Sequence, residues 1–190
     1  MSHFFMIEEK IYSLNSDGKD MERIVTIMKE IIHSSLGREE DIIFLCIGSD
    51  QSLGDSLGPL VGTMLKEQNV PYHVYGTLEK PINAFHIESA IKEIKLRYKK
   101  TLIISVGACL GEQNQVGYMF LRKGPLVQGD SLNGIVPIVG DYHFSGVVNY
   151  IDPLPTKQFL NDTRLYTIMN LARTIVNIIV QTVEEQLKLG

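Results

Sequence analysis

Apolar runs of strand length alternate with helix-like stretches through the first two thirds of the chain. Two of the runs, IIFLCI (42–47) and TLIISVG (101–107), contain almost no polar residue, which is typical of strands covered on both faces. Between them lie two segments with apolar residues at helical spacing and a shorter strand-like run at 72–76. Strand, helix, strand, helix, strand with short connections predicts a parallel sheet with right-handed crossovers.

Further elements are predicted on both sides of this unit. Apolar residues at helical spacing predict a helix over 21–36 and a long C-terminal helix that starts after the potential cap residues NDT (161–163). VGYMFL (116–121) and YHFSGVVNY (142–150) predict two more strands. The glycine- and proline-containing stretch 122–141 lacks periodicity, and we expect it to be mobile or to form a lid beside a binding cleft.

Composition indicates one globular α/β domain spanning residues 1–190. The chain is 44% hydrophobic and carries a net charge of −4 without a basic stripe, which argues against nucleic-acid binding. No stretch approaches 18 apolar residues and the N-terminus lacks the basic region of a secretion signal, so we expect a soluble, cytoplasmic protein without a membrane partner. Cys46 and Cys109 lie in apolar runs, as expected of buried thiols in a reducing compartment.

The glycine-rich segment GSDQSLGDSLGP (48–59) directly follows the first buried run. Its glycines fit neither of the common phosphate-binding spacings, and it contains no cation. Pro59 favours the first turn of a helix, so the next helix is expected to begin between residues 55 and 59. Asp55 is then either a helix cap or a working carboxylate near the strand ends, since a helix N-terminus favours a carboxylate there and Asp55 would repel a phosphate.

Three longer segments resemble the YyaC family of sporulation proteins. They are CIGSDQSLGDSLGPLVGTML (46–65), VYGTLEKPINA (74–84) and GACLGEQNQVGYMFLRKGPL (107–126), with NDTRL (161–165) as a shorter match. That family is similar to the germination protease that degrades small acid-soluble spore proteins and, more distantly, to HybD-like hydrogenase maturation endopeptidases. The resemblance implies a three-layer α/β/α fold with a mixed, mainly parallel sheet of the phosphorylase/hydrolase-like kind. It also implies a peptidase acting on a peptide or small spore protein in the forespore or spore interior.

The resemblance assigns a role to Asp55 and exposes a departure at Gly107. In the germination protease the position of Asp55 holds an acid proposed to be catalytic, and in the maturation endopeptidases the similar loop holds an acidic metal ligand. The second functional acid of these relatives falls in a VDACLG-like motif, where this chain reads VGACLG with Gly107. Two carboxylates sharing a site split their pKa values into an acid and a base, which a glycine cannot do. Asp130 or Asp141 could supply the missing acid from another loop.

Three further residues are candidates for supporting roles. Asp50 is either a turn residue or part of the site at Asp55. Cys109 and His143 suggest a cysteine hydrolase, although the neighbours of Cys109 are apolar and do not favour the thiolate. The histidines form no spaced cluster, and no motif predicts a cofactor; whether a metal is bound is left open.

Three functions therefore remain at this point. The first is a peptidase that uses Asp55, the second an inactive relative that binds a peptide or protein partner, and the third a small-molecule hydrolase that uses Cys109. In each case we expect segments 48–58 and 107–115 to flank one cleft, because both follow parallel strands at the same sheet edge. Association into a homo-oligomer is left open by the sequence.

Overall fold

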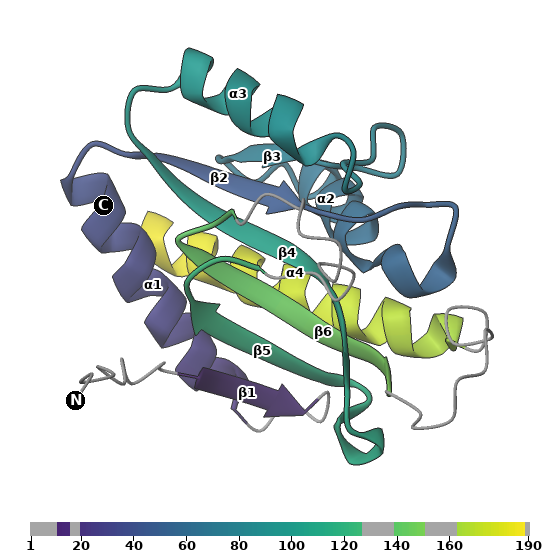
Figure 1. The fold of residues 1–190 in the computed structure, drawn as a ribbon. Coiled ribbons are helices and arrows are strands. Elements are labelled where there is room, and N and C mark those ends of the chain that lie inside the picture. Colours follow the sequence, from purple (N-terminus) through teal and green to yellow (C-terminus); the bar gives the residue numbers. More distant parts are fainter. Residues whose placement is uncertain (1–10, 16–19, 127–138, 151–162, 189–190) are drawn as a thin grey trace, which may run out of the picture.

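A six-stranded mixed sheet forms the centre of the molecule, in the order β1-β5-β6-β4-β2-β3 (Figure 1). The computed structural model describes residues 11–15, 20–126, 139–150 and 163–188. Strands β3, β2, β4 and β6 pair in parallel, whereas β5 pairs antiparallel with β6 and β1 antiparallel with β5. The elements in chain order are β1 (Ile11–Asn15), α1 (Met21–Gly37), β2 (Asp41–Cys46), η1 (Leu53–Asp55), α2 (Leu57–Glu67), β3 (His73–Tyr75), α3 (Ile87–Arg97), β4 (Thr101–Gly111), η2 (Gln113–Gln115), β5 (Tyr118–Lys123), β6 (Tyr142–Tyr150) and α4 (Leu165–Leu187).

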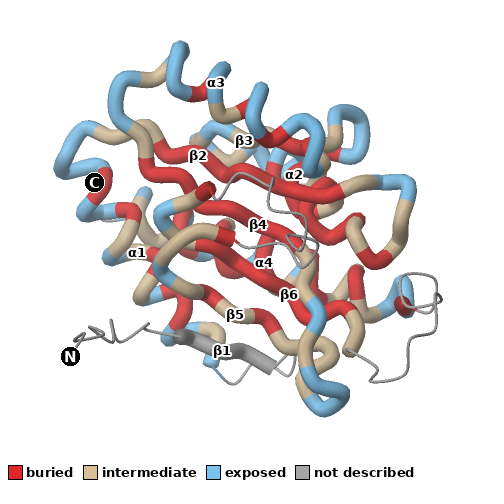
Figure 2. The backbone as a smooth tube through the Cα atoms, in the orientation of Figure 1, coloured by how far each residue is buried: buried red, intermediate tan, exposed pale blue. Residues whose placement is uncertain are grey.

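Helices cover both faces of the sheet and make the architecture three-layered. Apolar side chains of α1, α2 and α4 share one core cluster with the sheet, and α3 contributes to a second cluster on the opposite face. In Figure 1, β4 and β6 pass in front of α4, and Figure 2 shows the central strands buried along most of their length. The predicted three-layer α/β/α fold with a mixed, mainly parallel sheet is confirmed, and β2 and β4 are neighbours within it.

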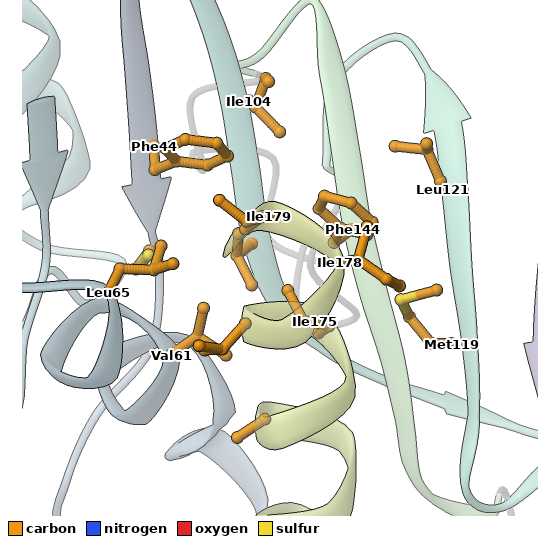
Figure 3. Packing of buried hydrophobic residues seen from close by; sticks show 14 of the residues in the cluster. Phe44, Val61, Leu65, Ile104, Met119, Leu121, Phe144, Ile175, Ile178 and Ile179 are labelled. Atoms are coloured by element: carbon orange, nitrogen blue, oxygen red, sulfur yellow. The ribbon is translucent and has the colours of Figure 1, made fainter. Parts of the chain in front are cut away.

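The larger core cluster is centred on α4. Ile175, Ile178 and Ile179 of this helix are fully buried and face Phe44 and Phe144 of the sheet (Figure 3). Each of these isoleucines removes enough apolar surface from water that truncation to alanine costs about 2–5 kcal/mol in comparable cores. The long apolar stripe predicted for the C-terminal helix is therefore the element that closes one face of the sheet.

The structure differs from the sequence-based expectations at two places, and it tests a third expectation only at the ends of one segment. The strand expected to end at 107 continues as β4 to Gly111, because β6 pairs with it beyond the point where β2 ends. The edge strand β1 was not expected, since its five residues show no clear alternation. The proposed lid at 122–141 lies mostly outside the described residues, but its ends are ordered: Leu126 and Val139 are buried and joined by a β-bridge.

Glycine residues allow α2 to lie directly against the ends of β2 and β3. A Cβ added to Gly62 would overlap the backbone carbonyl oxygen of Gly76, and it would also contact the Cβ of Cys46 at 3.2 Å. Because the clashing atom is backbone and not a flexible side chain, it cannot give way cheaply. The close approach of helix and sheet therefore depends on the missing side chain.

We predict that Gly62→Ala lowers the free energy of unfolding by about 3 kcal/mol, the upper part of the range for overpacked cores. The matched control is Gly37→Ala at the last residue of α1, where an added Cβ has no heavy atom within 4 Å. There the greater helix propensity of alanine should raise stability by about 0.5 kcal/mol. Urea unfolding of both variants measures the two effects. Equal stability of Gly62→Ala and wild type would contradict the described contact.

Candidate functional site

Asp55 lies at the carboxyl edge of the parallel strands, immediately before α2. It ends the short 3-10 turn η1, and α2 begins at Leu57, within the range predicted from the sequence. The Ser56 side chain that follows it donates to the Leu53 carbonyl, and no side-chain cap bond closes the start of α2. Asp55 therefore does not act as the helix cap. Its carbonyl accepts a hydrogen bond of 3.0 Å from the backbone N–H of Ser49, which ties the turn to the end of β2.

The environment of Asp55 makes its carboxyl group a weaker acid than usual. Burial raises its pKa from 3.8 to about 6, and a hydrogen bond from the backbone of Ser49 offsets this only in part. No charged side chain contributes to the shift. A carboxyl group with this pKa is present in both protonation states near neutral pH, as general acid–base chemistry requires.

Gly107 occupies an interior position of β4 at the same edge of the sheet. Val106, the preceding residue, accepts a hydrogen bond of 2.7 Å from the N–H of Ile47, the residue that follows β2. Gly107 is buried and pairs with Ser145 of β6. The chain therefore brings position 107 and the turn of Asp55 to the same end of β2, but position 107 contributes no carboxylate there.

The other aspartates do not fill this gap within the described residues. Asp141 accepts a hydrogen bond of 2.8 Å from the N–H of Ile103, near the amino end of β4, and so closes the start of β6. Four residues of extended strand, about 13 Å, separate Ile103 from Gly107, so Asp141 acts as a structural residue at the opposite end. Asp50 is exposed in the turn after β2. Asp130 lies outside the described residues.

A protein-bound metal at this site also lacks support in the described part of the chain. Among those residues, no group of three or more histidine, cysteine, aspartate or glutamate side chains could hold a metal ion. The acidic metal ligand that the resemblance implies for the loop of Asp55 therefore lacks companions there, and no chemical step is assigned to a metal.

Cys109 and His143 do not form a nucleophile–base pair. Cys109 is opposite Val147 in the pairing of β4 with β6, whereas His143 is opposite Ser105, four residues away along the strand. That offset is about 13 Å, far beyond hydrogen-bond reach. Burial raises the pKa of the half-buried Cys109 thiol, and its hydrogen bond with Ser145 and the positive charge of Arg122 oppose the rise only in part.

Cys109, Ser145 and His143 instead line a cavity of about 380 Å³ on the sheet face opposite α1, α2 and α4. Arg122 and Phe120 of β5 complete its floor. Neither residue was predicted from the sequence, although their alternation with apolar Met119 and Leu121 in YMFLRK indicates a strand with two different faces. The segment 48–58 does not line this cavity, so the predicted cleft between 48–58 and 107–115 stays a prediction.

Comparison with known proteins places the chain in a family. Residues 12–178 match the family described as "Protein of unknown function (DUF1256)". The chain belongs to this family. It is 36% identical over 174 residues to the uncharacterized protein YyaC of Bacillus subtilis (strain 168). The matched region covers 90% of this chain and 83% of that protein. The resemblance stated from the sequence is thereby confirmed at the level of the family.

One solved structure with a similar arrangement is a NiFe hydrogenase maturation protease, HycI, from Thermococcus kodakarensis KOD1. It is 14% identical to this chain, with a TM-score of 0.46, and the match covers 76% of this chain and 92% of that chain. None of the helices in the described part of the chain is both long and apolar enough to cross a membrane.

The raised pKa of Asp55 predicts a specific dependence of stability on pH. The unfolded chain loses the Asp55 proton near pH 3.8 and the folded chain near pH 6, so the folded protein binds more protons between these values. Stability due to this group is therefore present below pH 3.8 and is lost as the pH rises to about 6. Because part of the carboxyl group is in contact with water, the expected loss is on the order of 1 kcal/mol.

Urea unfolding from pH 4 to pH 7 measures this loss, with Asp55→Asn as the matched variant. The variant keeps the shape of the side chain and cannot ionise, so it should lack this loss and exceed wild type most at pH 7. Carbon NMR of the carboxyl group gives the pKa directly. A midpoint near 3.8 in the folded protein would show that Asp55 is not buried as described.

We predict that iodoacetamide alkylates Cys109 more slowly than free cysteine at neutral pH. The raised pKa lowers the fraction of reactive thiolate. A Cys46→Ala variant removes the second, fully buried thiol, so that mass spectrometry follows Cys109 alone. Alkylation faster than that of free cysteine would contradict the structure and return Cys109 to consideration as a nucleophile.

Proposed function

We propose that this protein is a peptidase-type hydrolase of low activity, whose single acid–base group is Asp55. The observation that carries the proposal is a half-buried carboxyl group with a pKa of about 6 at the carboxyl edge of a parallel sheet. In its ionised form such a group can take a proton from an attacking water, and in its protonated form it can give one to a leaving amine. Open α/β sheets bind their ligands at this edge.

The substrate class follows from the motif resemblance and not from the cavity geometry. The segments around Asp55 resemble those of a germination protease, so small acid-soluble spore proteins are the substrates to test first. The same resemblance motivates a role in sporulation and a location in the forespore. The cleavage assay described below tests the proposed substrate class.

Gly107 favours a second candidate function, the binding of a peptide or protein partner without cleavage. General acid–base assistance by a second group is typically worth about 10²–10⁴ in rate, and Gly107 cannot provide it. No charged side chain perturbs Asp55, so nothing in the described residues acts as the second carboxylate beside it. A protein without this partner could keep a peptide site and lose turnover.

The experiment that separates the two candidates is a proteolysis assay of purified protein on small acid-soluble spore proteins, with binding measured in parallel. The peptidase proposal predicts slow cleavage by wild type, with a pH–rate profile that changes near pH 6. Asp55→Asn should abolish this cleavage. Glu67→Gln, which removes an exposed carboxylate at the far end of α2, is the control and should leave cleavage unchanged.

Gly107→Asp extends this test by returning a carboxylate to the same end of β2. If the two acids work together, Gly107→Asp should raise the cleavage rate by about 10²-fold or more, and adding Asp55→Ala should remove the gain. Binding without cleavage by wild type and by Gly107→Asp would support the second candidate. Wild-type cleavage that survives Asp55→Asn would overturn the role of Asp55.

A further inference from the structure

The cavity beside Arg122 has no part in the proposed chemistry of Asp55. Its floor consists of β4, β5 and β6, and the segment Gly124–Leu126 lines it as well. His143 is hydrogen-bonded to that segment, since its Nδ1 lies 2.9 Å from the carbonyl oxygen of Gly124. At about 380 Å³ the cavity is within the size range of small-molecule sites.

Arg122 lies in this cavity without a counter-ion among the described residues. Its guanidinium lies over the ring of Phe120, 4.7 Å from the ring centre, which fixes the side chain against the floor. The Nε atom is buried and has no hydrogen-bond partner, and Arg122 forms no ion pair with any described residue. Arg122 as a whole is half-buried, but a buried donor atom without a partner costs free energy, so an acceptor that bound to Nε would be stabilising.

The rest of the lining is suited to a ligand that accepts hydrogen bonds. None of the described residues that line the cavity is an aspartate or glutamate, although the chain as a whole carries a net charge of −4. Lys123 adds a second cation at the end of β5. Gln115 accepts a hydrogen bond from the Glu112 N–H through its amide oxygen, which leaves its amide nitrogen as a donor group.

We propose that this cavity binds an oxyanion, either a carboxylate or a phosphate group, with Arg122 as its principal ligand. The planar guanidinium matches both groups because it can donate two parallel hydrogen bonds. The volume exceeds that of a bare ion, so the oxyanion belongs to a small organic molecule or to the end of a peptide. This site goes beyond the proposed peptidase function and does not depend on it.

Thermal unfolding in a phosphate-free buffer tests the proposal with three probes. These are inorganic phosphate, N-acetyl-alanyl-alanine with a free carboxylate, and the C-terminal amide of the same peptide. Phosphate or the free acid should raise the melting temperature of wild type, and the amide should not. If phosphate raises the melting temperature, the ligand carries a phosphate group. If the free acid raises it, the ligand carries a carboxylate.

Arg122→Gln should weaken binding of the active probe by about tenfold or more, because a charge-assisted pair is lost. Arg173→Gln removes an exposed arginine on α4 and should bind as wild type does. Asp55→Asn should also bind as wild type does, which keeps this result separate from the outcome of the cleavage assay. Without any probe, Arg122→Gln should melt at or above the wild-type temperature, since a buried donor atom without a partner has been removed.

Several results would overturn the site. One is a wild type that neither phosphate nor the free acid stabilises, and another is an Arg122→Gln variant that binds normally. A large fall in the melting temperature of Arg122→Gln without probe would show that another part of the chain already pairs with the arginine. Loss of binding in Asp55→Asn alone would assign the anion to the edge near β2 and not to this cavity.

Discussion

The direct contact between α2 and the ends of β2 and β3 is the constraint on which the candidate site depends. Glycines make this contact possible: a Cβ on Gly58 would overlap the carbonyl of Ile47, and one on Gly48 would overlap that of Asp55. The backbone of the turn is consequently pressed against the strand end, and the Asp55 carboxyl group is carried into a half-buried position. The glycine-rich segment thus serves close packing. The raised pKa of Asp55 follows from that packing, because desolvation is its main cause.

Much of the fold could be predicted because its central strands are buried on both faces. IIFLCI and TLIISVG have no polar face, and such runs directly predict buried strands. Pro59 with its flanking glycines sets the start of α2. Strand lengths were harder to predict. β4 continues to Gly111 only because β6 pairs with it there, with a register shift after Cys109. A pairing partner about 40 residues away cannot be predicted from local periodicity. The short β1 depends on β5 in the same way.

The candidate site was predictable in part for a related reason. Asp55 was found because its position follows from local rules about helix starts, and its location was then fixed by a parallel-sheet topology that could be deduced. The cavity at Arg122 was not found, since its residues come from three strands whose order β5-β6-β4 is set by tertiary pairing. Cys109 and His143 line one cavity but do not form the pair that the cysteine-hydrolase hypothesis requires. Only the register shows that Ser145, and not His143, is next to the thiol.

Gly107 connects the two regions. It precedes Cys109 by two residues in β4 and pairs with Ser145, which pairs in turn with Phe120. Successive residues of a strand face opposite sides, so position 107 belongs to the same sheet face as Ser105 and Cys109. A carboxylate at this position would therefore face the side of the sheet on which Cys109 and Ser145 line the cavity of Arg122. Among the described residues, Asp55 has no second acid that perturbs it, and Arg122 forms no ion pair. Gly107 adds no negative charge to this face of the sheet, and neither does any described residue of the cavity lining, which favours a ligand that brings its own negative charge.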